Sequence, residues 1–232
     1  MPRSFSRSPL VASAFAAGFL SATPSAAHAQ EQNAEMWVSA TVSGPISGPL
    51  LGSVEATLRI DDANTSQPTR VIRPMLGYKL SKPVSLWIGY TRIEQFPTGR
   101  PRATENRLFQ QVSWNMGEMG LIGLSSRTRL EQRYFSNGGG SAWRLREQLK
   151  ATIPLHRTHV SIIVTTEPFV TLQTSVPAAN TGLEQWRNSL GVSVALSKSV
   201  AIEVGYLNRY IVRHNAPDKV DHVMPLALSY RF

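Results

Sequence analysis

The feature that most constrains this chain is an alternation of apolar and polar residues that starts at Met36 and recurs to the last residue. A period of two is that of a β-strand with one apolar and one polar face. Clusters of turn-forming residues divide the alternation into eleven stretches. The predicted strands are Met36–Ser43, Leu51–Asp61, Arg70–Leu80, Val84–Phe96, Thr104–Met116, Leu121–Phe135, Ala142–Ile153, His159–Gln173, Leu183–Leu196, Val200–Arg213 and Val220–Phe232. The chain is therefore predicted to be all-β.

The connections between these stretches alternate in length. Short ones, such as Leu80–Pro83 and Ser197–Ser199, interleave with longer ones, such as Asp61–Thr69 and Ser175–Gly182. Outer-membrane barrels have the same asymmetry, with tight periplasmic turns and longer external loops, and a tilted strand crosses the bilayer in about ten residues. We predict an antiparallel transmembrane β-barrel of the outer-membrane type, with 10–12 strands. After position 30 no apolar run is long enough for a helical span.

The first 29 residues have the features of a secretory signal peptide. Arg3 and Arg7 are basic, Leu10–Ala22 is largely apolar, and Ala27-His28-Ala29 has the small-x-small pattern of a cleavage site. We expect a signal peptide at 1–29, a barrel domain at 30–232 and a location in the bacterial outer membrane. The chain has no cysteine, so disulfides do not stabilise it.

The C-terminal stretch sets the direction of the chain. Leu226, Leu228, Tyr230 and Phe232 alternate with smaller or polar residues, and the chain stops on the aromatic ring. This pattern is similar to the assembly signal of outer-membrane proteins, whose last strand ends at the periplasmic side. The expected partners are therefore outer-membrane lipid and the insertion machinery, which would read this strand.

Aromatic residues on the apolar faces then fall into two belts, as rings with a polar edge do at the two bilayer interfaces. The periplasmic belt is Tyr78, Trp114, Tyr230 and Phe232, and the external belt is Phe96, Tyr134, Trp143, Trp186 and Tyr210.

The strand count conflicts with this topology. An even barrel with both chain ends in the periplasm cannot have eleven strands. We therefore expect that Met36–Ser43 does not span fully or that a twelfth strand exists. The glycines and prolines from Gly44 to Pro49 are expected to interrupt pairing after the first stretch.

Charged residues on the polar faces define the candidate site. An arginine or lysine facing lipid at the midplane costs about 2–4 kcal/mol, so these side chains are predicted to line the lumen. The candidates are Arg127, Arg129, Glu131, Arg133, Arg144, Arg146, Arg187, Glu203 and Arg209. Five of them, Arg127, Arg129, Arg133, Arg144 and Arg146, are expected to form a positive wall on two adjacent strands. Two functions remain open: a small anion-preferring pore, or a closed barrel filled by arginine–glutamate ladders.

Some polar residues oppose this assignment of faces. Gln110, Gln132, Glu147, Glu184 and Asn188 fall on the predicted lipid face. Glu184 and Asn188 fit at the external interface, and a local bulge would turn Gln132 and Glu147 inward.

Other functional classes find little support. His159 and Ser161 share a strand face, as a base and a nucleophile must, but they lie at the periplasmic turn and toward the lumen, away from an acyl-chain substrate. No catalytic residue, metal site or cofactor is predicted. The formal net charge of +9 comes from dispersed residues, so nucleic acid is not an expected partner. The alternatives are a membrane-embedded lipid hydrolase or deacylase, and a soluble periplasmic β-barrel that binds a ligand.

The layout of short motifs resembles an uncharacterised outer-membrane barrel family, domain of unknown function 2490. The matching features run from about Glu35 to Phe232. They are Trp37, Glu55-Ala-Thr-Leu-Arg59, Leu76-Gly-Tyr-Lys-Leu80, Leu86-Trp-Ile-Gly-Tyr90, Glu105-Asn-Arg107, Arg127-Thr-Arg-Leu-Glu-Gln-Arg-Tyr134, Trp143-Arg-Leu-Arg146 and the final aromatic strand. The resemblance implies an outer-membrane location and no known activity.

Overall fold

The computed structural model describes residues 31–61, 65–136, 139–176, 179–214 and 216–232, where every regular element is a strand. The strands are β1 (Glu31–Ser47), β2 (Leu50–Asp61), β3 (Thr65–Lys79), β4 (Val84–Pro97), β5 (Ala103–Met119), β6 (Ile122–Phe135), β7 (Ser141–Pro154), β8 (Val160–Thr174), β9 (Gly182–Ala195), β10 (Val200–Ile211) and β11 (Lys219–Arg231). Each corresponds to one predicted stretch. No helix in the described ranges is long and apolar enough to cross a membrane. The predicted signal peptide lies outside the described residues.

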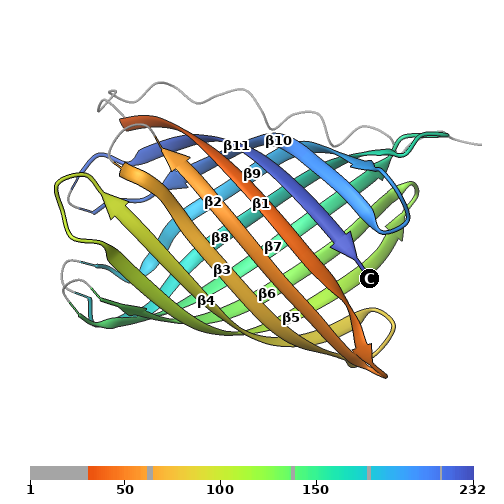
Figure 1. Cartoon of the computed structure of the whole chain (residues 1–232), viewed down its shortest axis with the longest axis horizontal. Coiled ribbons are helices and arrows are strands. Elements are labelled where there is room, and N and C mark those ends of the chain that lie inside the picture. Colours follow the sequence, from red (N-terminus) through yellow and green to blue (C-terminus); the bar gives the residue numbers. More distant parts are fainter. Residues whose placement is uncertain (1–30, 62–64, 137–138, 177–178, 215) are drawn as a thin grey trace, which may run out of the picture.

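The eleven strands form a closed barrel in which each strand pairs antiparallel with its neighbours in sequence (Figure 1). The exception is the pair β1 and β11, which is parallel and runs in register from Glu31↔Lys219 to Ser43↔Arg231. In a meander with an odd number of strands the first and last strands point the same way, so only a parallel pair can close it. The expectation of an even count was therefore wrong, and β1 is a full-length strand.

The hairpin connections lie alternately at two ends of the barrel. Their lengths follow the prediction except after β2, where β3 begins at Thr65 and leaves only three residues in place of the predicted longer loop. At one end, called here the short-turn end, lie residues 48–49, 80–83, 120–121, 155–159 and 196–199, together with the end of β11. The other end, called the long-loop end, is where β2, β4, β6, β8 and β10 end and where β1, β3, β5, β7, β9 and β11 begin. Among its connections, 98–102 is described in full. Gly48 and Gly120 have positive φ angles of 53° and 65°, which let the two-residue turns reverse the chain.

The distribution of residues is inverted relative to a soluble protein. Among the described residues, sixteen polar or charged side chains are buried against nine apolar ones. The large exposed apolar side chains lie instead on the outer wall, where Leu76, Ile88 and Leu190 are each about 60 % exposed. Charged residues are almost never buried in soluble domains unless they are paired. The inner face of this barrel is therefore the polar one.

Two inward aromatic rings lie over glycines of the adjacent strand. Gly77 pairs with Trp87 and Gly89 pairs with Phe109. A Cβ atom at Gly77 would come within 2.6 Å of the Trp87 ring, and one at Gly89 within 2.3 Å of the Phe109 ring. The glycines thus leave the space that these rings fill, a device that also fixes strand register.

Candidate functional site

The lumen has two regions of different chemistry. The region toward the long-loop end is filled by paired charges, and the region at the short-turn end contains a cavity. We call the filled region the ion-pair layer. It consists of Glu105, Glu131, Glu167 and Glu184 with Arg107, Arg127, Arg129, Arg133, Arg144 and Arg146, all on β5–β9.

Glu131 of β6 lies at the centre of the ion-pair layer. Its side chain is 1 % exposed and accepts hydrogen bonds from Arg144 Nη2 at 2.5 Å and from Arg146 Nη1 at 2.8 Å. Arg129 Nη1 lies 3.9 Å and Arg107 Nη1 3.8 Å from its carboxylate oxygens. Removing one partner from a buried ion pair typically costs about 3–5 kcal/mol, because a charge is left uncompensated.

Three further carboxylates extend the ion-pair layer. Glu167 of β8 accepts hydrogen bonds from Arg127 at 2.8 Å and Arg146 at 2.9 Å. Glu105 of β5 accepts from Arg107 at 2.7 Å and Arg133 at 2.6 Å. Each carboxylate bridges two guanidinium groups, which reduces the repulsion between arginines of neighbouring strands.

Glu184 supplies the remaining carboxylate, although the alternation places it on the outer face. The register between β8 and β9 shifts between Phe169 and Val170, and Glu184 has no partner there between Gln185 and Leu183. This bulge turns the side chain inward, where it meets Arg133 at 2.9 Å, Arg144 at 2.9 Å and Thr171 Oγ1 at 3.0 Å. The expected outward position of Glu184 was therefore wrong.

Aromatic rings fill the spaces between the guanidinium planes. Phe169 of β8 is fully buried, with the guanidinium carbons of Arg146, Arg187 and Arg144 at 4.2, 4.5 and 5.0 Å from its ring centroid. The guanidinium carbon of Arg129 lies 4.2 Å from the centroid of Phe109. Such stacking is favourable when the cation is desolvated, and it packs flat groups without voids.

A second cluster of charges lies in the lumen beside the β1–β11 seam. Trp37 of β1 has the guanidinium carbons of Arg59, Arg187 and Arg209 at 4.2, 5.0 and 5.3 Å from its ring. Arg209 forms ion pairs with Glu35 and with Asp221, which is fully buried. Strands distant in the sequence are thereby joined across the lumen.

The predicted lumen residues all face inward, but they do not form a positive wall. Arg127, Arg129, Arg133, Arg144 and Arg146 meet four carboxylates, three of which come from β5, β8 and β9. The other candidates, Arg187, Arg209 and Glu203, lie elsewhere around the lumen, and Glu203 pairs only loosely with Lys150 at 3.9 Å. Most of the surplus of positive charge that sequence reasoning placed on β6 and β7 is thus paired, because four carboxylates lie among these five arginines.

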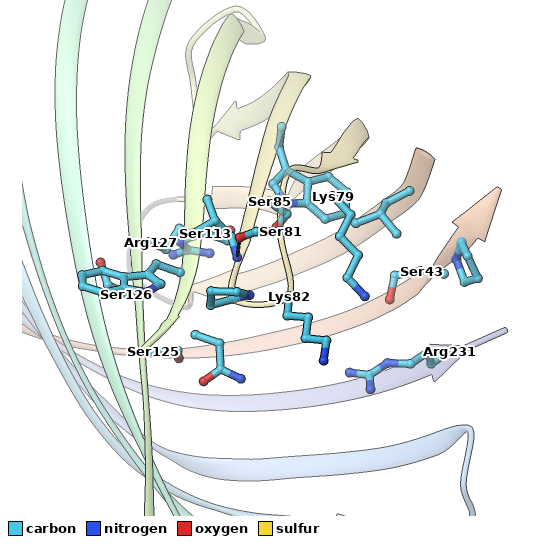
Figure 2. Close-up of a pocket in the computed structure, with 18 of the residues that line it drawn as sticks. Ser43, Lys79, Ser81, Lys82, Ser85, Ser113, Ser125, Ser126, Arg127 and Arg231 are labelled. Atoms are coloured by element: carbon cyan, nitrogen blue, oxygen red, sulfur yellow. Dashed lines mark hydrogen bonds between the residues drawn. The ribbon is translucent and has the colours of Figure 1, made fainter. Parts of the chain in front are cut away.

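The short-turn end contains a vestibule, a cavity of about 600 Å³. Figure 2 shows Lys79, Lys82, Arg127 and Arg231 around it, with several serines between them. No carboxylate side chain is among its lining residues. Within the described ranges Lys79, Lys82 and Arg231 form no ion pair, whereas Arg127 at the inner limit of the cavity donates to Glu167. Lys79, Lys82 and Arg231 are not among the candidate residues selected from the sequence.

The remaining polar residues of the outer wall bond to one another. Gln110 and Gln132 exchange hydrogen bonds, and Glu147 accepts from Ser126 Oγ at 2.5 Å and from Thr128. Asn188 accepts from Thr166 at 2.8 Å. Gln132 and Glu147 therefore stay on the outer face without a bulge, and pairing with neighbouring strands lowers the cost of their position.

In the described residues, His159 and Ser161 do not form a base–nucleophile pair. His159 is exposed in the β7–β8 connection, and no hydrogen bond joins its ring to Ser161. Throughout the part of the chain that the structure describes, no three histidine, aspartate or glutamate side chains are grouped as metal ligands.

Comparison with known proteins identifies relatives whose descriptions assign no activity. The family described as a protein of unknown function (DUF2490) matches residues 34–220. An uncharacterised protein of Methylorubrum extorquens is 30% identical over 203 residues, which cover 87% of this chain and 89% of the relative. No solved structure matches.

Proposed function

Since the chain belongs to the DUF2490 family, whose description assigns no activity, we propose a function from the geometry of the barrel itself. We propose that it is an integral outer-membrane β-barrel whose lumen is closed by the ion-pair layer, so that it does not conduct ions. Open water is confined to the vestibule at the short-turn end and to the long-loop end.

The membrane part of the proposal is supported by the inverted distribution of residues. The outer wall carries exposed leucine, isoleucine and valine side chains on consecutive strands, whereas arginine and glutamate are buried inside. An exposed apolar surface of this extent is expected on a membrane-facing protein and not on a soluble ligand binder. Tyr78, Trp114, Tyr230 and Phe232 at the short-turn end, and Tyr134, Trp143 and Trp186 toward the long-loop end, are each more than 40% exposed. These positions match the interfacial aromatic belts.

The proposal of a closed lumen rests on the burial of inward side chains around the whole circumference of the barrel. Every strand except β10 contributes at least one buried inward side chain, among them Trp37, Arg73, Thr91, Phe109 and Asp221. On β10, Arg209 is held by Glu35 and Asp221. The interior of a barrel of about eight strands is filled by side chains, whereas 16–18 strands leave an aqueous channel. Eleven strands need large residues to fill the lumen, and arginine, phenylalanine and tryptophan supply that volume.

Conductance in a planar bilayer tests the closed lumen. The refolded protein, shown to be folded by its altered gel migration before boiling, is expected to give no stepwise current under conditions where a general porin conducts. Ohmic conductance with anion preference would overturn the proposal and favour the pore. Conductance with cation preference would also overturn it.

The proposed site of recognition by the insertion machinery is the end of β11. Leu226, Leu228, Tyr230 and Phe232 lie outward, and the Phe232 amide donates to Ser43 O at 3.1 Å, which ties the last residue to β1. Phe232→Ala is expected to reduce the amount of heat-modifiable protein in the outer membrane without reducing export. Normal levels would contradict this role.

A further inference from the structure

The vestibule differs from the ion-pair layer in how its positive charge is balanced. Four cations line it, no carboxylate does, and three of the four have no ion-pair partner in the described residues. In the ion-pair layer each carboxylate instead bridges at least two arginines. Unmatched like charges in a concave, partly enclosed space repel one another and attract anions more strongly than they would on an open surface.

The cations surround the cavity from separate strands. Lys79 and Lys82 come from the end of β3 and the turn after it, Arg231 from β11, and Arg127 from β6 (Figure 2). Lys79, Lys82 and Arg231 are exposed at the short-turn end, whereas the Arg127 side chain lies deeper and is 26% exposed. A ligand with anionic groups at more than one position would meet cations at the mouth and at the inner limit.

Neutral donors supply the second element of an oxyanion site. The hydroxyl groups of Ser43 and Ser125 make no hydrogen bond in the described residues, and the amides of Asn115 and Gln148 also line the cavity. Hydroxyl and amide groups donate directional bonds to phosphate or carboxylate oxygens. The volume of about 600 Å³ lies within the range of small-molecule sites and exceeds that of a single inorganic ion.

From this combination we infer that the vestibule binds a small soluble molecule carrying two or more phosphate or carboxylate groups, which enters from the short-turn end. The continuous hydrogen-bonded wall separates the cavity from lipid at the sides, so a lipid headgroup is not the ligand. The inference depends on the cavity and its charges. It does not depend on whether the barrel conducts.

Calorimetric titration of the full refolded barrel in detergent micelles tests the inference, with pyrophosphate and citrate as probes for the two oxyanion classes and glucose as the neutral control. Saturable binding of either anion, without heat from glucose, is expected. The relative affinity of the two anions identifies the class. Absence of saturable binding for both anions would overturn the inference and leave the closed lumen untouched.

The variant Lys79→Gln with Lys82→Gln removes two vestibule cations, both exposed, so folding should be retained. Each lost charge is expected to weaken binding about fivefold, the factor for a unit charge about 4 Å away in a water-like medium. The matched control is Arg157→Gln with Lys198→Gln, which changes net charge equally at the same end but outside the cavity lining. Equal weakening in both variants would indicate non-specific attraction and would overturn the site.

Discussion

The two regions of the lumen contain basic residues in opposite roles. In the ion-pair layer, guanidinium groups are buried, stack on aromatic rings and pair with shared carboxylates, so they pack the interior of the barrel. In the vestibule, Lys79, Lys82 and Arg231 keep their charge exposed and unpaired. The difference lies in the acids. Glu105, Glu131, Glu167 and Glu184 all lie in the ion-pair layer, and none lines the vestibule.

The largest expected difference between the two ends of the barrel is their accessibility to a reagent outside the cell. Thr98 is exposed in the β4–β5 connection at the long-loop end, and Lys198 is exposed in the β9–β10 turn at the short-turn end. On intact cells, an impermeant thiol reagent should label Thr98→Cys and leave Lys198→Cys unlabelled until the outer membrane is opened. The natural chain has no cysteine, so no other position of this chain reacts with the reagent. The reverse pattern would invert the topology, and equal labelling of both sites would argue against a spanning barrel.

The second prediction tests whether the ion-pair layer stabilises the folded barrel. Glu131→Gln keeps the shape of the side chain but leaves Arg144 and Arg146 without the charge they share. We expect a loss of about 3–5 kcal/mol in the free energy of unfolding, measured by urea titration in detergent.

The matched control for that change is Glu203→Gln. Glu203 pairs with Lys150 at 3.9 Å, and both side chains are more than a third exposed, so the loss should be below about 1 kcal/mol. Similar losses of unfolding free energy in the two variants would show that a buried ion pair stabilises the barrel no more than an exposed one.

A smaller effect concerns the seam that closes the barrel. A Cβ atom at Gly44 of β1 would lie 2.5 Å from the Phe232 carbonyl oxygen, whereas one at Gly123 of β6 has its nearest neighbour at 3.8 Å. Gly44→Ala should therefore cost about 1–3 kcal/mol in unfolding free energy through overpacking. Gly123→Ala should be neutral or slightly stabilising. A neutral Gly44→Ala would mean that the end of β11 does not lie against β1 as described.

The smallest expected effect is a change in the pH dependence of local stability at the long-loop end. Hydrogen bonds from the Tyr210 hydroxyl and the Arg213 amide lower the pKa of Asp218 below its usual value of 3.8. Because the folded pKa is the lower one, the stabilisation is present above the unfolded pKa and is lost as pH falls through the folded pKa. Asp218→Asn should flatten the acid dependence of hydrogen exchange in this loop. An unchanged profile would show that the contact contributes nothing.

The repeating pattern predicted the strands well, because outward-facing apolar residues and lumen-facing polar residues alternate along each strand. It also assigned Arg129, Arg144 and Arg146 to the lumen, since no other position tolerates so many charges. The pattern also gave the correct count of eleven strands, but the parallel seam was missed because a barrel with an even number of strands was expected.

The sequence left open whether the arginines form a positive wall or arginine–glutamate ladders. Which carboxylate faces which arginine depends on the register of five strands, and only the three-dimensional pairing supplies it. Glu184 was misplaced because a bulge inverts one residue while the alternation on either side continues. The vestibule depends on Lys82, which belongs to a turn, and on Arg231, which belongs to the other end of the chain.

The parallel pairing of β1 with β11 limits how the chain can be rearranged. The paired segment contains 13 residues, about 40 Å at roughly 3.3 Å per residue, and separates the start of β1 from the end of β11. In a barrel with an even number of strands a short linker can join the two ends, so the chain can be circularly permuted. Here such a linker would have to cross the full height of the wall. Peptides fused before β1 and after β11 would accordingly emerge from opposite ends of the barrel.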